Sequence, residues 1–62
     1  MGYKVKEFRE EKRMTQEELA QKSGVSRPTI VAIENNKIKD VKLSTLMKLA
    51  DALDTTVDAI FF

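Results

Sequence analysis

The stretch of sequence that decides the fold covers residues 14–37 and reads MTQEELAQKSGVSRPTIVAIENNK. Its first half contains a strong signal for the start of a helix. Thr15 can act as the N-cap, and Glu18 lies at the third helical position, as in a capping box. Met14 and Leu19 have the spacing of a hydrophobic staple across the same start. Gly24 is placed to end this helix, because glycine readily adopts the left-handed conformation found at helix C-termini.

A second helix is expected directly after the first. Ser26 is its expected N-cap, and Val25 and Ile30 have the spacing of a second staple. Pro28 falls in the first turn, where the missing backbone N–H costs little. The helix ends just before Asn36, which can take up the left-handed conformation that stops it. Since only three residues join the two helices, they must cross at a steep angle, which predicts a helix-turn-helix unit.

Hydrophobic periodicity predicts further helices on both sides of this pair. The first covers residues 3–12 and places Val5 and Phe8 on one face. A later helix covers about residues 43–53. Its apolar stripe consists of Leu43, Leu46, Met47, Ala50 and Leu53.

The last expected helix is very short and covers about residues 57–61. Thr55 or Thr56 can cap it. The side chains that close the core from this helix are Val57, Ile60 and Phe61. None of the five helices is long enough to be stable alone, so all five must share one core. The expected fold is therefore all-α, with five short helices in a single domain over residues 1–62.

The composition excludes several classes of protein. The 62 residues include no cysteine and no histidine, which removes disulfides, thiolate metal sites, the usual general base and the commonest metal ligand. A domain of this size also has too little volume for a deep pocket. We therefore expect no enzymatic activity, metal site, cofactor or small-molecule ligand. The longest apolar runs are four residues and no export or lipidation signal is evident, so we expect no membrane span and a cytoplasmic location.

Charge is distributed unevenly along the chain, although the net charge is only +1. Residues 22–42 contain five basic and two acidic side chains, a local charge of +3. Residues 43–62 contain one basic and three acidic side chains, a local charge of −2. A positive central third indicates one face directed at a polyanion. From charge alone, an uneven but merely solvated surface is the simpler explanation.

The outward face of the second helix of the pair is unusually apolar for a solvated surface. Ile30 and Ile33 face the core. The side chains on the opposite side or beside it are Arg27, Pro28, Thr29, Val31, Ala32 and Asn35. Small side chains allow close approach to a DNA major groove, where they can contact thymine methyl groups, and arginine and asparagine can hydrogen-bond to base edges. An ordinary exposed face and a protein-binding patch are the alternatives.

Together these segments resemble the Cro and phage-repressor family of helix-turn-helix proteins, the xenobiotic-response-element (XRE) type. The quoted stretch is similar to its helix-turn-helix, at about residues 15–35. LSTLMKLADAL at 43–53 and VDAIF at 57–61 are similar to its fourth and fifth helices. Arg13 and Asn36 depart from the family, because glycine is common at both positions. The resemblance implies a lambda-repressor-like DNA-binding domain.

The resemblance also implies roles for individual residues. The positions that meet base edges are Arg27, Pro28 and Ala32, to which the outward face adds Val31. The positions that lie near the DNA backbone are Gln16, Ser26, Thr29, Asn35, Asn36 and Lys37. Gln16 is also implied to brace the recognition helix. Arg9 and Glu34 match an ion pair between the first and third helices, whereas from the sequence alone two solvated side chains are the simpler interpretation.

These features predict a sequence-specific regulator of transcription that binds double-stranded DNA. The expected mode is repression by occupying a promoter, which requires no effector or sensor domain. An antitoxin and a restriction–modification controller are alternative functions for the same fold. A protein-interaction adaptor that uses the same helix pair is a further alternative.

A single recognition helix covers only a few base pairs, which gives one small domain too little discrimination against other sites in a genome. Specific binding therefore requires a second copy of the domain. We expect a homodimer on a palindromic operator, with half-sites about one helical turn, roughly 34 Å, apart. The interface is expected at the last helix with the chain end, and at the loop after Leu53. Its residues are Ile60, Phe61 and Phe62.

Overall fold

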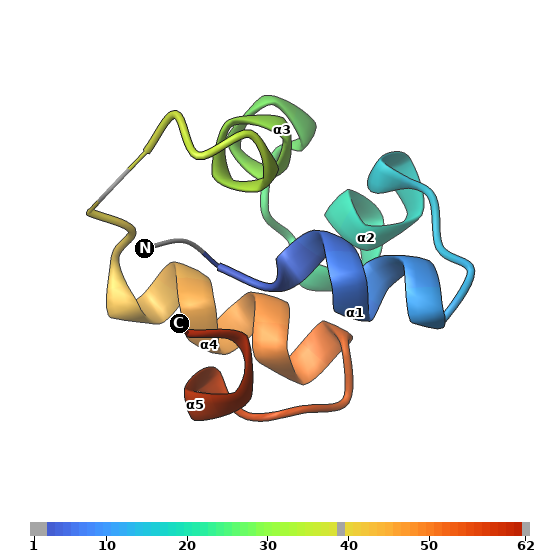
Figure 1. The fold of residues 1–62 in the computed structure, drawn as a ribbon. Helices are drawn as coiled ribbons and strands as arrows, with labels where there is room; N and C mark the ends of the chain where they lie inside the picture. The colour runs from blue at the N-terminus through green and yellow to red at the C-terminus, as the bar shows by residue number, and fades with distance from the viewer. Residues whose placement is uncertain (1–2, 39, 62) are drawn as a thin grey trace.

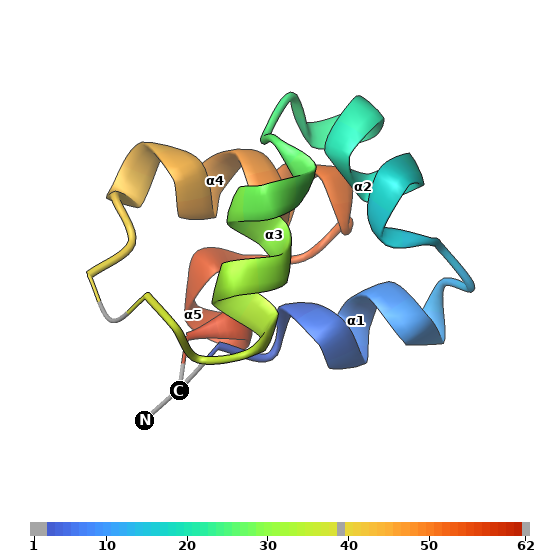
Figure 2. The same cartoon turned by 90° about the horizontal axis from the view of Figure 1, so that it is seen from above.

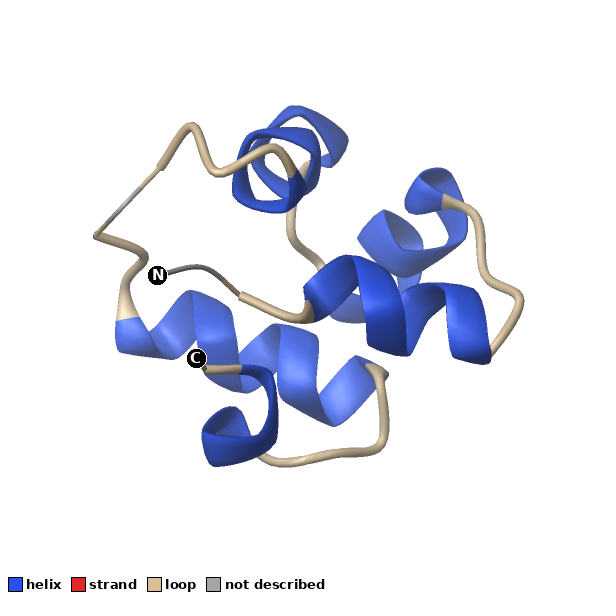
Figure 3. Cartoon of the chain, viewed as in Figure 1, coloured by secondary structure: helices blue, strands red, loops and turns tan. Residues whose placement is uncertain are grey.

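The computed structural model describes residues 3–38 and 40–61, which fold into five helices (Figure 1). They are α1 (Val5–Glu11), α2 (Gln16–Ser23), α3 (Arg27–Glu34), α4 (Leu43–Ala52) and α5 (Val57–Ile60). The described residues contain no strand, only helices and loops (Figure 3). The predicted all-α fold of five short helices is therefore confirmed. None of these five helices has the length and hydrophobicity needed to cross a membrane.

The predicted start and end of α2 are both present. The backbone N–H of Thr15 donates to Glu18 Oε1 (2.8 Å) and that of Glu18 donates to Thr15 Oγ1 (3.0 Å), which completes the capping box. Gly24 follows the last turn with a φ angle of +77°. Its N–H donates to the carbonyl oxygen of Ala20 (2.9 Å). These two signals limit α2 to eight residues.

α3 also begins and ends where the sequence predicts. Ser26 Oγ accepts a hydrogen bond from the N–H of Thr29 (3.4 Å), and Pro28 lies in the first turn. Asn36 follows the helix with a φ angle of +57°. In Figure 1, α3 is seen nearly end-on while α1 and α4 run across the view, so α3 lies steeply to both.

Among residues 3–38 and 40–61, two other non-glycine residues adopt the left-handed conformation. Arg13, with φ +56°, makes the turn between α1 and α2 at a position where the resembled family commonly has glycine. Asp54, with φ +57°, follows α4 and is a residue type that tolerates this conformation. After this turn Thr56 Oγ1 accepts from the N–H of Ala59 (3.1 Å), so Thr56 rather than Thr55 caps α5.

All five helices contribute to a single core. The buried hydrophobic side chains are Val5, Leu19, Val25, Ile30, Ile33, Leu46, Leu49, Ala50, Ala52, Leu53 and Ile60. Seen from above, α3 lies over the middle of the molecule with α1, α2 and α4 around it (Figure 2). Ile30 and Ile33, on the inward side of α3, are fully buried. This packing leaves the opposite side of α3 facing outward.

The apolar stripe predicted for α4 is wrong at two positions. Leu43 and Met47 are 63% and 56% exposed, whereas Leu49, which the predicted stripe omits, is fully buried. α4 packs against both α2 and α5, so its inward side contains Leu46, Leu49 and Leu53. Apolar residues occupy more than the inward side of this helix, and periodicity alone does not show which edge of a wide stripe the neighbouring helices cover.

The end of the chain also differs from the prediction. Phe61 lies beyond α5 in an extended conformation and is 52% exposed instead of closing the core. It forms an antiparallel bridge with Tyr3, and the centroids of the two rings are 5.6 Å apart. The N–H of Lys4 donates to the carbonyl oxygen of Ile60 (2.8 Å). Ile60 itself is fully buried, so it is a core residue rather than a surface residue open to a dimer partner. Phe62 lies outside the described residues.

Candidate nucleic-acid interface

The candidate interface is built on the N-termini of α2 and α3. A shallow hollow lies beside them and is lined by Arg9, Thr15, Gln16, Glu17, Glu18, Gln21 and Arg27. The first turn of α2 contains Glu17 and Glu18, whereas the first turn of α3 contains no acidic residue. The positive end of the α3 dipole is therefore not balanced within its first turn, and this end favours an anion.

The outward side of α3 brings the candidates for base contact together. Arg27 and Pro28 are exposed at its N-terminus, and Val31 and Ala32 are half-buried one turn later. A guanidinium can donate two hydrogen bonds to a guanine, while short apolar side chains permit a close approach and contact thymine methyl groups. The side chains that could discriminate bases thus follow one another along a single helix.

Apart from Gln16 on α2, the candidates for contact with the DNA backbone lie at the two ends of α3. At its start, Ser26 Oγ and Thr29 Oγ1 are 2.8 Å apart and share a hydrogen bond. At its end, Asn35, Asn36 and Lys37 are all exposed. Hydroxyl, amide and ammonium groups are the side-chain donors that phosphate oxygens accept from. Polar groups therefore flank the apolar middle of the helix on two sides.

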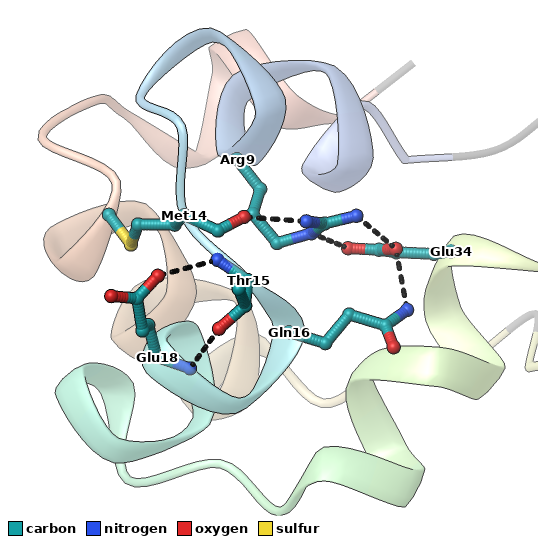
Figure 4. A network of polar contacts seen from close by, with 6 residues as sticks. All are labelled: Arg9, Met14, Thr15, Gln16, Glu18 and Glu34. Carbon is teal, nitrogen blue, oxygen red and sulfur yellow. Dashed lines mark hydrogen bonds and ion pairs between the residues drawn. The ribbon is translucent and has the colours of Figure 1, made fainter.

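The ion pair that the resemblance implies is present. Arg9 donates from Nε to Glu34 Oε2 (2.7 Å) and from Nη2 to Glu34 Oε1 (3.2 Å), and its Nη1 donates to the carbonyl oxygen of Met14 (2.6 Å) (Figure 4). The Arg9 and Glu34 side chains are only 11% and 2% exposed. The hydrogen bond to Glu34 raises the pKa of Arg9 above the ordinary value for arginine, although burial acts in the opposite direction. Arg9 therefore lines the hollow, but its charge is balanced by Glu34.

Gln16 extends this pair to α2. Its Nε2 donates to Glu34 Oε1 (3.0 Å), the oxygen that also accepts from Arg9 Nη2. Side chains from α1, α2 and α3 thus meet at one buried carboxylate. Gln16 itself is half-buried and lines the hollow. The residue implied to lie near a phosphate is therefore held directly against α3.

Gln21 is a residue of the hollow that the sequence analysis missed. It is exposed and lies in the same lining as Gln16 and Arg27. Gln21 is four residues after Glu17, so both project from the same side of α2. Glu17 is not itself a predicted contact, and Gln21 is five residues after Gln16, so helical spacing in the sequence gives no signal for Gln21.

The sequence of this chain matches a known protein family and several curated proteins. The helix-turn-helix family model matches residues 5–60. The chain is 43% identical over 61 residues to an "Uncharacterized HTH-type transcriptional regulator" of Methanocaldococcus jannaschii. This alignment covers 98% of this chain and 91% of that protein. It is 38% identical over 61 residues to the HTH-type transcriptional repressor RghR of Bacillus subtilis. This alignment covers 98% of this chain but only 45% of RghR.

A solved structure shares the fold. One such structure is the crystal structure of SinR, the master regulator for biofilm formation, in complex with DNA. SinR superposes on this chain with a TM-score of 0.85 at 33% sequence identity. The alignment covers 89% of this chain and 87% of that chain. The family match, the relatives and the shared fold all agree with the resemblance found in the sequence. The chain therefore belongs to the XRE-type helix-turn-helix family of transcriptional regulators.

Proposed function

We propose that this protein is a sequence-specific DNA-binding repressor that acts by occupying a promoter. The observation that carries the proposal is the outward side of α3, which has an exposed Arg27 at its start, small apolar side chains along the next turn and polar groups at both ends. A major groove admits one helix of this kind and presents guanine acceptors and thymine methyl groups to it. The likeness to SinR, whose structure was solved in complex with DNA, supports DNA binding.

In the proposed complex each part of α3 has its own task. Arg27 donates to the O6 and N7 atoms of a guanine, and Val31 and Ala32 contact thymine methyl groups, with Pro28 beside them at the first turn. The residues that contact the DNA backbone are Gln16, Ser26, Thr29, Asn35, Asn36 and Lys37. Backbone contacts set the register of the helix, and base contacts set the sequence preference.

The proposed active species is a homodimer on a palindromic operator. Two copies related by a two-fold axis present two recognition helices to half-sites about one helical turn, roughly 34 Å, apart. We assign the interface to the exposed aromatic surface of Phe61, supported by Tyr3, with Phe62 beside it in the sequence. Ile60 supports this surface from the core but does not form it, because it is fully buried.

Selection of bound sites from random double-stranded DNA tests the proposal. The expected outcome is an enriched inverted repeat whose two halves are spaced by one helical turn. On the enriched site, affinity should fall steeply as salt rises, because protein cations displace counterions from the phosphates. Absence of DNA binding at every salt concentration would reject the proposal and favour an adaptor that binds protein.

Transcription in vitro then tests the mode of regulation. A promoter that contains the selected site should lose transcript as the protein is added. The matched control is the same promoter with the two half-sites scrambled, which should be unaffected. Increased transcript from the intact promoter would contradict repression while leaving sequence-specific binding intact.

A further inference from the structure

We infer that Glu34 is a positioning residue for DNA binding: it holds the Gln16 side-chain amide so that the second N–H of Nε2 faces a backbone phosphate. The inference rests on the proposed function, because it assigns the donor and the orientation of one contact in the proposed complex. It concerns residues that meet at one point from three helices, α1, α2 and α3 (Figure 4).

The orientation of Gln16 follows from the chemistry of its partner. An ionised carboxylate accepts hydrogen bonds and has no proton to donate. Gln16 must therefore turn Nε2, and not its carbonyl oxygen, toward Glu34, which is the orientation of the 3.0 Å contact. The amide nitrogen carries two N–H groups, and Glu34 accepts from one of them. The second N–H remains available as a donor, and Gln16 lines the hollow beside the N-termini of α2 and α3.

This orientation matters because a phosphate oxygen is also acceptor-only. If the amide were turned over, its carbonyl oxygen would take the place of Nε2, and both anions would then face an oxygen that cannot donate to them. With Nε2 between them, a single nitrogen donates inward to Glu34 and outward to the phosphate. Glu34 thereby selects the one amide orientation that suits DNA, although its own side chain is only 2% exposed.

A negative charge beside DNA would ordinarily weaken binding. Arg9 removes this cost, because its Nε and Nη2 both donate to the Glu34 carboxylate and the pair carries no net charge. Its Nη1 also holds the carbonyl oxygen of Met14, just before α2 begins. Arg9 therefore acts on the phosphate contact through Glu34 and through the position of α2.

A methylphosphonate scan of the selected operator tests the inference. Each substitution replaces one charged phosphate oxygen by a methyl group, and affinity is measured for the wild type, Gln16→Ala, Glu34→Gln and Glu7→Gln. In the wild type, substitution at one phosphate position per half-site should lower the affinity by about tenfold. The same substitution should have no effect on the affinity of Gln16→Ala, because the contact is already absent. Glu34→Gln should lose most of the same sensitivity, because a neutral amide can donate as well as accept and no longer fixes Gln16. Glu7→Gln is the matched control, since it removes one negative charge from an exposed site on α1.

The direction of the change separates positioning from general electrostatics. Removing a negative charge should by itself strengthen DNA binding, as expected for Glu7→Gln, whereas Glu34→Gln should weaken binding to unmodified operator by about threefold to tenfold. Circular dichroism at the assay temperature verifies that each variant is folded. Full retention of the methylphosphonate effect in Glu34→Gln would overturn the inference while leaving DNA binding itself established.

A second measurement needs no variant. In the free wild-type protein, the Gln16 Nε2 protons should exchange with water more slowly than those of Gln21, which is exposed on the same helix. NMR of the side-chain amides measures both rates in one sample. Equal exchange rates would show that Glu34 does not hold the amide and would overturn the inference. Failure of the wild type to bind any DNA would instead reject the proposed function.

Discussion

Arg9 and Glu34 are 25 positions apart in the sequence, and the distance between Arg9 Nε and Glu34 Oε2 is 2.7 Å. The pair joins α1 to the last residue of α3. Loss of one partner leaves the other charge where water reaches it poorly, and this penalty is much larger for a buried pair than for an exposed one. A contact between residues that are distant in sequence therefore ties α3 to α1.

Arg9→Ala should lower the free energy of unfolding by about 2–4 kcal/mol, because the Glu34 carboxylate stays buried without its charged partner. The double variant with Glu34→Ala should lose less than the sum of the two single variants. Chemical denaturation of the four proteins measures this coupling. Additive effects would show that the two side chains contribute independently and that the pair does not hold α3.

The same coupling should not depend on pH near neutrality. The pKa of Arg9 is raised in the folded protein, so its contribution to stability is complete below the unfolded-state pKa of arginine and is lost only as pH rises through the still higher folded value. Both lie far above neutral pH. The double-mutant cycle should therefore give the same coupling at about pH 6 and about pH 9. A coupling that decreased over this interval would contradict the assignment of the pair to Arg9.

Arg27→Ala should cost about 1–3 kcal/mol of binding free energy on the selected operator and relax the preference at one base pair. Lys37→Ala is the comparison, because a phosphate contact should weaken binding to all sequences alike and lower the salt slope by about one. Affinities for the operator and for single-base variants of it, at several salt concentrations, separate the two patterns. Equal losses of specific and non-specific binding in Arg27→Ala would reassign Arg27 to the DNA backbone.

Gly24→Ala should destabilise the protein by about 1 kcal/mol for backbone reasons alone. An added Cβ would meet no atom within 4 Å, but the φ angle of +77° is unfavourable for alanine. Gly24→Asn should cost less, since asparagine tolerates this conformation. Arg13→Gly should have the opposite sign, because Arg13 already lies at φ +56°. Thermal and chemical denaturation measure all three, and an unchanged stability in Gly24→Ala would exclude backbone strain at this turn.

Local signals in the sequence predicted the helix-turn-helix well. Thr15, Glu18, Gly24 and Ser26 act on atoms within a few residues of themselves, so their spacing determines the caps and the turn. The resemblance to the XRE-type family added the Arg9–Glu34 pair, which no local rule predicts. Periodicity could not show that Gln16 would share an oxygen of Glu34 with Arg9, since that contact depends on how three helices pack.

The errors occurred where tertiary packing chooses among several apolar residues. α4 has apolar side chains on two edges, and its contacts with α2 and α5 bury Leu49 while leaving Met47 in solvent. At the chain end, Phe61 leaves the helical path and forms an antiparallel bridge with Tyr3. A pairing between residues near opposite ends of the chain has no periodic signature. Both differences place apolar side chains on the surface, where they are candidates for the proposed dimer interface.

Phe61→Asp should weaken the proposed homodimer. Its ring is the exposed aromatic surface at the chain end. In a two-fold interface both copies contribute this residue, so dimer formation would remove two aspartate side chains from water, at a cost in free energy. We expect the dimer dissociation constant to rise by at least about tenfold, which corresponds to about 1.4 kcal/mol. Sedimentation of the wild type and the variant at equal concentrations, with and without operator, measures the change.

Met47→Asp is the matched comparison, because it places the same charge on another exposed apolar side chain, on α4. If the chain-end surface forms the interface, this variant should sediment like the wild type, whereas Phe61→Asp should contain more monomer. The opposite result would move the interface to α4 and keep the dimer. Monomers in every case, even with operator present, would refute dimerisation, because a two-fold complex on a palindrome requires both copies to be bound together.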